Sequence, residues 1–192
     1  MVQLDLFGTK TYDTKEDSTK IYLPPRYQSA EPVMVPFGKK KKQNKSIDQL
    51  AVEDYSYFMW FLNRADGLQY YPQAQDRFRA VHHVMNNAVM TKKCRCCGKP
   101  VCLVSLAIGH DGPTASTYFT YASKECFEND PQANYHRTQL APLKADALWM
   151  KKKVITKDLH ETLLHCMGMK EGRKTKQYLN DFFNTVELTK PL

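Results

Sequence analysis

The residues best suited to chemistry are the cysteines of one short segment. Four of the six cysteines fall within residues 94–102, and Cys126 follows after a run of strand-forming residues. Cys94 and Cys97 form a Cys-x-x-Cys pair that Gly98 follows, a spacing that lets one tight turn direct two thiolates at a single zinc ion. The sequence therefore predicts a structural zinc site with Cys94, Cys97 and Cys126 as three of its ligands.

The fourth ligand is less well defined by the sequence. A second cysteine pair often closes such sites, but Ala122 stands where the partner of Cys126 is expected. Cys102 completes the predicted set of four, although a cysteine within a strand is often only a small core residue. The alternatives to Cys102 are His110, Cys96 and His136. A buried thiol cluster without a metal is the other interpretation of the whole group.

Two histidine patterns are weaker candidates for metal binding than the cysteines. His160 and His165 resemble a metalloprotease His-Glu-x-x-His motif, but the string is one residue too long, and five helical residues rotate the second imidazole away from the first. We therefore expect the two rings to diverge. His82 and His83 are expected to be surface or interface residues.

The basic residues occur in groups, and the chain carries a formal net charge of +8. A polyanion is the natural partner of such groups, because each lysine that neutralises a phosphate releases a condensed counterion. Grouped lysines also occur simply as solvated surfaces. Two groups are predicted to contact nucleic acid: one consists of Lys39, Lys40, Lys41, Lys42 and Lys45, and the other of Lys92, Lys93, Arg95 and Lys99.

The composition predicts a folded protein of the cytoplasm that does not span a membrane. Of the 192 residues, 42% are hydrophobic, enough for a core, yet no apolar run is long enough to cross a bilayer. The first residues also lack a basic leader. In a reducing compartment, clustered thiols are more often metal ligands than disulfides, and this favours zinc as the cofactor.

The pattern of elements predicts an α+β fold that is mostly helical. Apolar residues at helical spacing predict helices over 47–63 and 75–90 in an N-terminal basic region, residues 1–90. A second region, residues 91–134, contains the zinc knuckle, a β-hairpin of 101–108 with 117–121, and a short helix that Ser123 caps and that holds Cys126. Helices over 140–154, 158–167 and 174–188 predict a C-terminal helical bundle, residues 135–192.

The string Val35-Pro36-Phe37-Gly38-Lys39, followed by the helix that holds Tyr55 and Trp60, resembles a small bacterial domain found alone and at the C-terminus of exonuclease X. The resemblance covers about 30 residues, lacks the glycine that follows the basic residues in that domain, and has Ala51 at its helix-starting proline. It implies a role in nucleic-acid metabolism. Physically, we expect Phe37 to pack on the helix while the lysines point outward.

The order of basic region, Cys94-x-x-Cys97 knuckle with Cys126, and helical C-terminal part also resembles the small large-subunit protein of type IV CRISPR complexes. That resemblance implies a non-enzymatic subunit that contacts guide RNA and the DNA motif beside the target, with other protein subunits as partners. Under it, Gln43 and Asn44 are candidates to read base edges.

Two other classes of function stay open. One is a metal-dependent nuclease or a nuclease accessory protein, for which Asp111, Glu125, Glu128 and Asp130 are the acidic residues near the knuckle. The other is a phage or plasmid adaptor whose zinc module contacts proteins.

Overall fold

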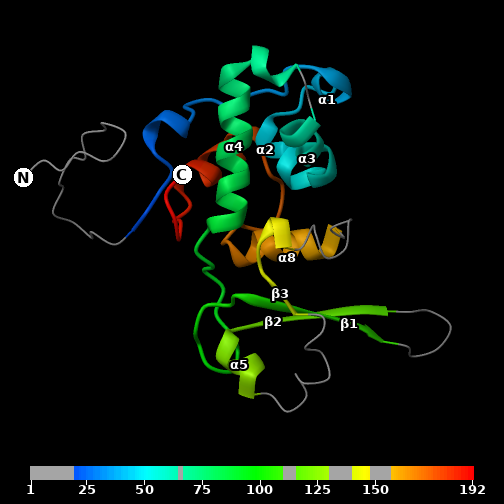
Figure 1. The fold of residues 1–192 in the computed structure, drawn as a ribbon, viewed down its shortest axis with the longest axis vertical. Helices are drawn as coiled ribbons and strands as arrows, with labels where there is room; N and C mark the ends of the chain where they lie inside the picture. The colour runs from blue at the N-terminus through cyan, green and yellow to red at the C-terminus, as the bar shows by residue number, and fades with distance from the viewer. Residues whose placement is uncertain (1–19, 65–66, 110–115, 130–139, 148–156) are drawn as a thin grey trace, which may run out of the picture.

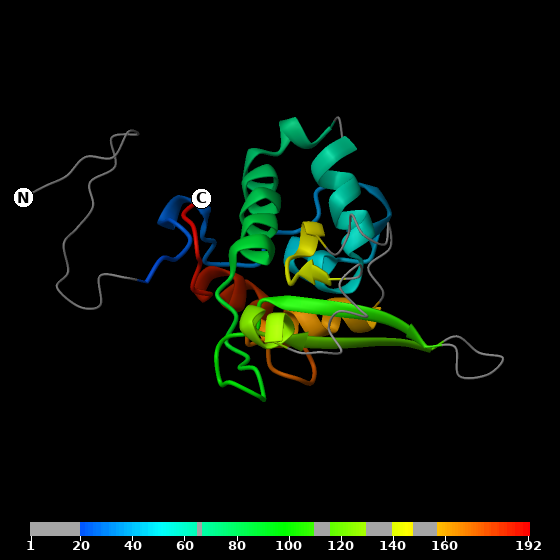
Figure 2. The same ribbon diagram turned by 60° about the horizontal axis from the view of Figure 1, so that its bottom comes forward.

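The computed structural model describes residues 20–64, 67–109, 116–129, 140–147 and 157–192, and these residues are mostly helical. Figure 1 shows the helices of the N-terminal region at one end of the molecule and a small sheet at the other, and Figure 2 shows the sheet from a second direction. The helical elements are η1 (Pro25–Tyr27), α1 (Gly38–Lys42), α2 (Ile47–Glu53), α3 (Tyr55–Arg64), η2 (Leu68–Tyr70), α4 (Pro72–Asn87), α5 (Lys124–Asn129), α8 (Lys157–Cys166) and α9 (Lys176–Thr185).

The helix predicted over 47–63 is two helices, and Asp54 is the reason for the break. α2 begins with a capping box, in which the Ser46 hydroxyl accepts from the Gln49 amide and the Gln49 side chain accepts from the Ser46 amide. At Asp54 the backbone leaves helical geometry, and its carboxylate accepts a hydrogen bond from the Tyr57 amide at 3.2 Å. Asp54 therefore ends α2 and caps α3.

α4 begins at Pro72, three residues before the predicted start, because proline suits the first turn of a helix, where no backbone donor is needed. Of the apolar residues that predicted this helix, Phe78, Val81 and Met85 are buried. The helices predicted over 158–167 and 174–188 are present as α8 and α9.

The sheet has the order β2-β1-β3, with β1 (Leu103–Gly109), β2 (Ser116–Ala122) and β3 (Leu140–Pro142). β1 and β2 pair antiparallel from Leu103 opposite Ala122 to Gly109 opposite Ser116. The helix predicted to begin at Leu140 is wrong at its start, because residues 140–142 pair with β1 instead. Three residues are too few to reveal a strand period, and the open edge of β1 supplies their backbone partners.

One hydrophobic core runs through the described residues and draws on all three predicted segments. Phe58, Phe61 and Phe78 pack together in the N-terminal helices, and the same cluster includes Val104 of β1 and Leu163 of α8. α8 and α9 each pack against α2 and so complete the N-terminal core. The predicted C-terminal bundle is not confirmed within the described residues, and residues 148–154 of its predicted first helix lie outside them.

A buried ion pair crosses this core. Asp48 of α2 and Arg77 of α4 are 0% and 2% exposed, and the guanidinium donates to both carboxylate oxygens, at 2.8 and 3.1 Å. Arg77 also donates to the Asn184 side chain at 2.6 Å and to the Asn180 carbonyl at 3.3 Å. Both asparagine amides donate to the Ser29 carbonyl. The network joins α2, α4, α9 and the segment after η1.

The segment that follows α9 pairs with two distant parts of the chain. Leu188 forms isolated bridges with Ile21 and with Ala88, and its amide donates to the Ile21 carbonyl at 2.6 Å. The Val89 amide donates to the Glu187 carbonyl at 2.8 Å. Residues 187–188 therefore join the start of the described chain to the end of α4.

The Pro36-Phe37-Gly38 turn packs on α3, as expected. The Phe37 ring lies 5.0 Å from that of Phe61. Gly38 has a φ of +80°, and a β-carbon there would lie 2.9 Å from the Tyr57 hydroxyl oxygen. The turn thus requires glycine for its backbone angle and for the close approach of Tyr57. No helix in the described part of the chain is both long and apolar enough to cross a membrane.

Candidate metal centre and basic surfaces

The cysteine turn, residues 94–98, is the loop of a short hairpin. Lys93 pairs with Pro100, the Cys94 amide donates to the Lys99 carbonyl at 2.8 Å, and the Gly98 amide donates to the Cys94 carbonyl at 2.9 Å. Gly98 has a φ of +71°, which glycine adopts at little cost. The turn brings the Cys94 and Cys97 thiols close together, as the Cys-x-x-Cys spacing predicts.

Cys126 reaches the same place from the first turn of α5. The Ser123 hydroxyl accepts a hydrogen bond from the Cys126 amide at 3.3 Å, so Ser123 caps this helix, as predicted. The Sγ atoms of Cys94, Cys97 and Cys126 all lie within 4.8 Å of one another, and those of Cys94 and Cys126 are 3.5 Å apart. Two thiolates on one tetrahedral zinc ion, with Zn–S bonds of about 2.3 Å, are about 3.8 Å apart. The group could therefore hold a metal ion.

The structure does not bring Cys102 into this group, which corrects the predicted set of four. Its amide donates to the Ala122 carbonyl and its carbonyl accepts from Leu143, so the backbone is fixed in the sheet while the side chain is exposed. Cys96 is exposed and also lies outside the group. The other two alternatives, His110 and His136, lie outside the described residues.

Ser123 has a second contact that the sequence did not indicate. Its hydroxyl lies 3.0 Å from the Cys97 sulfur, in addition to capping α5. A serine at a helix start is a common signal for a cap and carries no signal for contact with a thiol. The Ser123 hydroxyl is therefore an additional polar group at the cysteine cluster.

The Cys94 and Cys126 thiols differ in their readiness to ionise. Backbone amides of Ser123, Cys97 and Cys96 lower the pKa of Cys94 to about 6. The Ser123 hydroxyl lowers the pKa of Cys126. The contacts of the Cys126 thiol with Cys97 and Cys94 act in the opposite direction and prevail, so the pKa of Cys126 is raised to about 11. One negative charge is thus favoured in the cluster and a second is opposed. A bound cation removes that opposition, because it attracts each thiolate.

The basic residues of the cysteine turn are not equally available. The Lys99 ammonium pairs with the Glu125 carboxylate at 2.8 Å, and the Lys92 ammonium lies 3.1 Å from the His165 ring nitrogen Nε2. Lys93 and Arg95 are exposed, and neither makes an ion pair within the described residues. Of the four residues predicted to contact phosphate here, these two are exposed and not engaged by a carboxylate within the described residues.

The first predicted group lies on and just after α1. Lys40 pairs with Asp54 at 3.1 Å, and Lys45 pairs with Glu53 at 2.7 Å. The side chains of Lys39, Lys41 and Lys42 are exposed and make no ion pair in the described part of the chain. The candidate base readers Gln43 and Asn44 are also exposed.

The two basic groups are far apart in the molecule. Figure 1 shows α1 at the end of the molecule opposite to α5, and Lys99 of the cysteine turn pairs with Glu125 of that helix. The sequence did not indicate this separation, because tertiary packing determines where α1 and the cysteine turn lie. The two groups therefore form two distinct surfaces.

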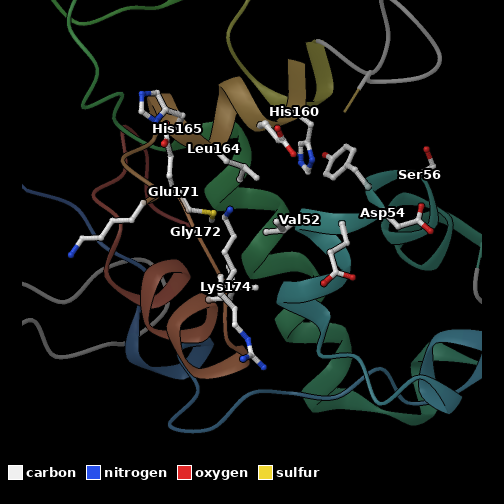
Figure 3. Close-up of a pocket in the computed structure, with 16 residues that line it drawn as sticks. Val52, Asp54, Ser56, His160, Leu164, His165, Glu171, Gly172 and Lys174 are labelled. Atoms are coloured by element: carbon white, nitrogen blue, oxygen red, sulfur yellow. The ribbon is translucent and has the colours of Figure 1, made fainter. Parts of the chain in front are cut away.

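A cavity of about 880 Å³ lies between the α2–α3 junction, α8 and the loop before α9. Figure 3 shows His160 and His165 at separate places along α8, so the two imidazoles diverge, as expected from their spacing. His160 is only 6% exposed and packs on the Tyr55 ring at 5.5 Å. Burial lowers the pKa of His160 to about 4, so its ring is neutral at neutral pH.

The remaining histidines and acidic residues form no cluster of their own within the described residues. His82 contacts the Asp146 carboxylate at 2.9 Å, and His83 contacts the Lys190 carbonyl at 3.0 Å. Glu125 and Glu128 are exposed and pair with lysines, while Asp111 and Asp130 lie outside the described residues. In the part of the chain that the structure describes, the three cysteines are the only group of three or more possible metal ligands.

Comparison with known protein families, with curated proteins and with solved structures finds no match to this chain.

Proposed function

We propose that this chain is a non-enzymatic, zinc-containing nucleic-acid-binding subunit of a larger nucleoprotein assembly. The observation that carries the proposal is the difference among the lysines at α1. Lys40 and Lys45 are paired with carboxylates, which holds the segment against α2 and α3, whereas Lys39, Lys41 and Lys42 are left exposed and unpaired within the described residues. Unpaired ammonium groups on a fixed helix suit contact with phosphates, because binding releases counterions without breaking an ion pair.

Zinc has a structural role in this proposal. Cys94, Cys97 and Cys126 would hold the ion, and thiolate ligands favour zinc over harder cations such as magnesium. The metal would fix the cysteine turn to α5 and so fix the direction of Lys93 and Arg95, which form the second basic surface. The resemblance to the type IV CRISPR subunit suggests one class of assembly in which two separated nucleic-acid contacts are useful.

The salt dependence of binding tests the proposal. The triple variant Lys39→Ala, Lys41→Ala, Lys42→Ala should weaken binding to duplex DNA and reduce the slope of log K against log salt by about 0.9 for each phosphate that is no longer neutralised, or about 3 in all. A matched control replaces three other exposed lysines, Lys144, Lys170 and Lys190, with alanine. The control removes the same charge from elsewhere on the protein.

The two triple variants separate the possible outcomes. A reduced slope in the α1 variant alone supports the proposal. Equal slopes in the two variants would show that only net charge matters, and the assigned surface would then be wrong. Binding of a protein partner that is insensitive to salt, with no nucleic-acid binding, would favour the adaptor alternative. Metal-dependent cleavage of DNA by the purified chain would favour the nuclease alternative.

A further inference from the structure

An unusual set of aromatic side chains lies beside α1. Trp60, Tyr70 and Tyr71 are 40%, 77% and 42% exposed, and they make up three of the four exposed large hydrophobic residues in the described chain. A tryptophan and two tyrosines left in water lose the stabilisation that burial would give them. Their exposure near the lysines therefore points to a ligand that covers them.

We call the following rings the aromatic belt: Tyr57, Trp60, Phe37 and Tyr71, which ring contacts connect, and Tyr70, which lines the same groove as Tyr71. The Tyr57 and Trp60 rings are stacked, with centroids 5.3 Å apart and an angle of 11° between their planes. Phe37 lies 5.7 Å from Tyr71, and the buried Phe61 links Phe37 to Trp60 through contacts of 5.0 and 5.2 Å. Three separate parts of the chain, α3, the turn before α1 and the η2 segment, thus contribute to one set of rings.

Positive charge borders the aromatic belt directly. The Lys40 ammonium lies 6.0 Å from the centre of the Tyr57 ring while it pairs with Asp54. α1, which holds the three exposed lysines, lies next to α3 in Figure 1. A groove of about 540 Å³ runs past Tyr70 and Tyr71, and its described lining contains Glu31 but no lysine or arginine. The cations near the aromatic belt are therefore the lysines of α1, beside the stacking faces and outside the groove.

Single-stranded nucleic acid uses both properties. Phosphates of any form contact lysines, but the faces of the bases in a duplex are already stacked on one another, whereas those of a single strand are free to stack on aromatic rings. We propose that the aromatic belt binds the bases of a single strand while the exposed lysines of α1 contact its phosphates. This inference rests on the proposed function and names the form of nucleic acid that the α1 surface binds.

The test compares single-stranded and duplex binding of the full chain. The probe is fluorescently labelled oligothymidylate, used alone or annealed to oligodeoxyadenylate, and binding is followed by fluorescence anisotropy at several salt concentrations, with affinities compared at the same salt. Trp60→Ala should weaken single-strand binding about 5- to 150-fold, the range for loss of one stacked ring, with a much smaller effect on the duplex. Trp60→Phe keeps a ring and should retain most of the affinity.

Tyr22→Ala is the matched control, because Tyr22 is 45% exposed and lies outside the aromatic belt. It should leave both affinities unchanged. Thermal unfolding of each variant checks that the chain is still folded, and Tyr70→Ala provides a second belt variant at a more exposed position.

Failure of this inference is distinguishable from failure of the proposed function. If the wild-type chain binds both probes with a slope that depends on the α1 lysines, but Trp60→Ala changes neither affinity or changes both equally, the belt does not bind bases. If the wild-type chain binds neither probe, the proposed function itself is wrong. Capture of a proline-rich peptide at the belt, without nucleic-acid binding, would overturn both.

Discussion

Replacement of Asp48 tests the main polar contact of the core. In Asp48→Asn the side chain keeps its shape but loses its charge, and its new amide group faces an Arg77 donor instead of accepting from it. The guanidinium remains 2% exposed and now lacks a counter-charge. Removal of one partner from a buried pair costs about 3–5 kcal/mol, because the remaining charge is still desolvated.

The hydrogen bonds of the pair give a similar magnitude. Arg77 donates two charge-assisted bonds to Asp48, each worth about 1.5–3 kcal/mol. Asp48→Asn removes one of them and leaves the other with a neutral acceptor at about half its strength, so the loss amounts to roughly 2–4.5 kcal/mol. The contacts of Arg77 with Asn180 and Asn184 remain and hold the guanidinium in place. Since a single domain is stabilised by about 5–15 kcal/mol, the variant should be strongly destabilised but still measurable at low temperature.

The complementary variant should behave differently with pH. Burial raises the pKa of Asp48, and Arg77 opposes that increase. In Arg77→Met the opposition is removed, so the pKa of Asp48 rises further and the carboxyl binds a proton more readily in the folded than in the unfolded state. The stability of Arg77→Met should therefore improve as the pH falls through the raised pKa of Asp48 towards the ordinary pKa of an aspartate, whereas Asp48→Asn lacks this titration.

Urea unfolding followed by circular dichroism measures all of these changes. The double variant Asp48→Leu, Arg77→Met should be more stable than Asp48→Leu alone, because it leaves no charge of this pair uncompensated in the core. If Asp48→Asn costs less than about 1 kcal/mol, or if the effects of the two substitutions are additive, the two side chains do not form a buried, energetically coupled pair.

Two further predictions concern His160 and the cysteine cluster. Burial lowers the pKa of His160 to about 4 from about 6.5 in the unfolded chain, so its contribution to stability is complete above about pH 6.5 and is lost as the pH falls towards 4, by about 2 kcal/mol at pH 5. Unfolding of the wild type and of His160→Leu at several pH values checks this, and equal pH dependence in the two would refute it. For the cluster, we expect one zinc ion per chain by elemental analysis, with loss of the metal and a lower melting temperature in Cys94→Ser and Cys126→Ser. The exposed Cys102 is the control: zinc loss in Cys102→Ser, or no zinc in the wild type, would contradict the assignment.

Local signals in the sequence identified the parts of the site that depend on neighbouring residues. The Cys94-x-x-Cys97 turn and the cap at Ser123 each depend on a few adjacent positions, and the structure brings Cys94, Cys97 and Cys126 together. Phe37 also packs on α3 as its turn indicated. Such features are predictable because local backbone geometry largely determines them.

The features that the sequence did not indicate depend on long-range pairing. Arg77 has the spacing of an ordinary helical residue, and nothing near it shows that Asp48 will lie against it in the core. The 140–142 strand exists because β1 offers an edge, and Cys102 is kept from the cluster by backbone pairing on both sides. The separation of the two basic groups likewise follows from tertiary packing.

The pairing of Leu188 with Ile21 and Ala88 also bears on synthesis of the chain. A ribosome adds the residues in order, so α4 and the segment around Ile21 are complete long before residue 188 exists to join them. Asn184, which helps to hold Arg77, arrives equally late. Contacts between such distant positions slow folding, and apolar faces stay exposed until they form. We therefore expect the contacts of residues 184–188 with the N-terminal helices to be among the last to form.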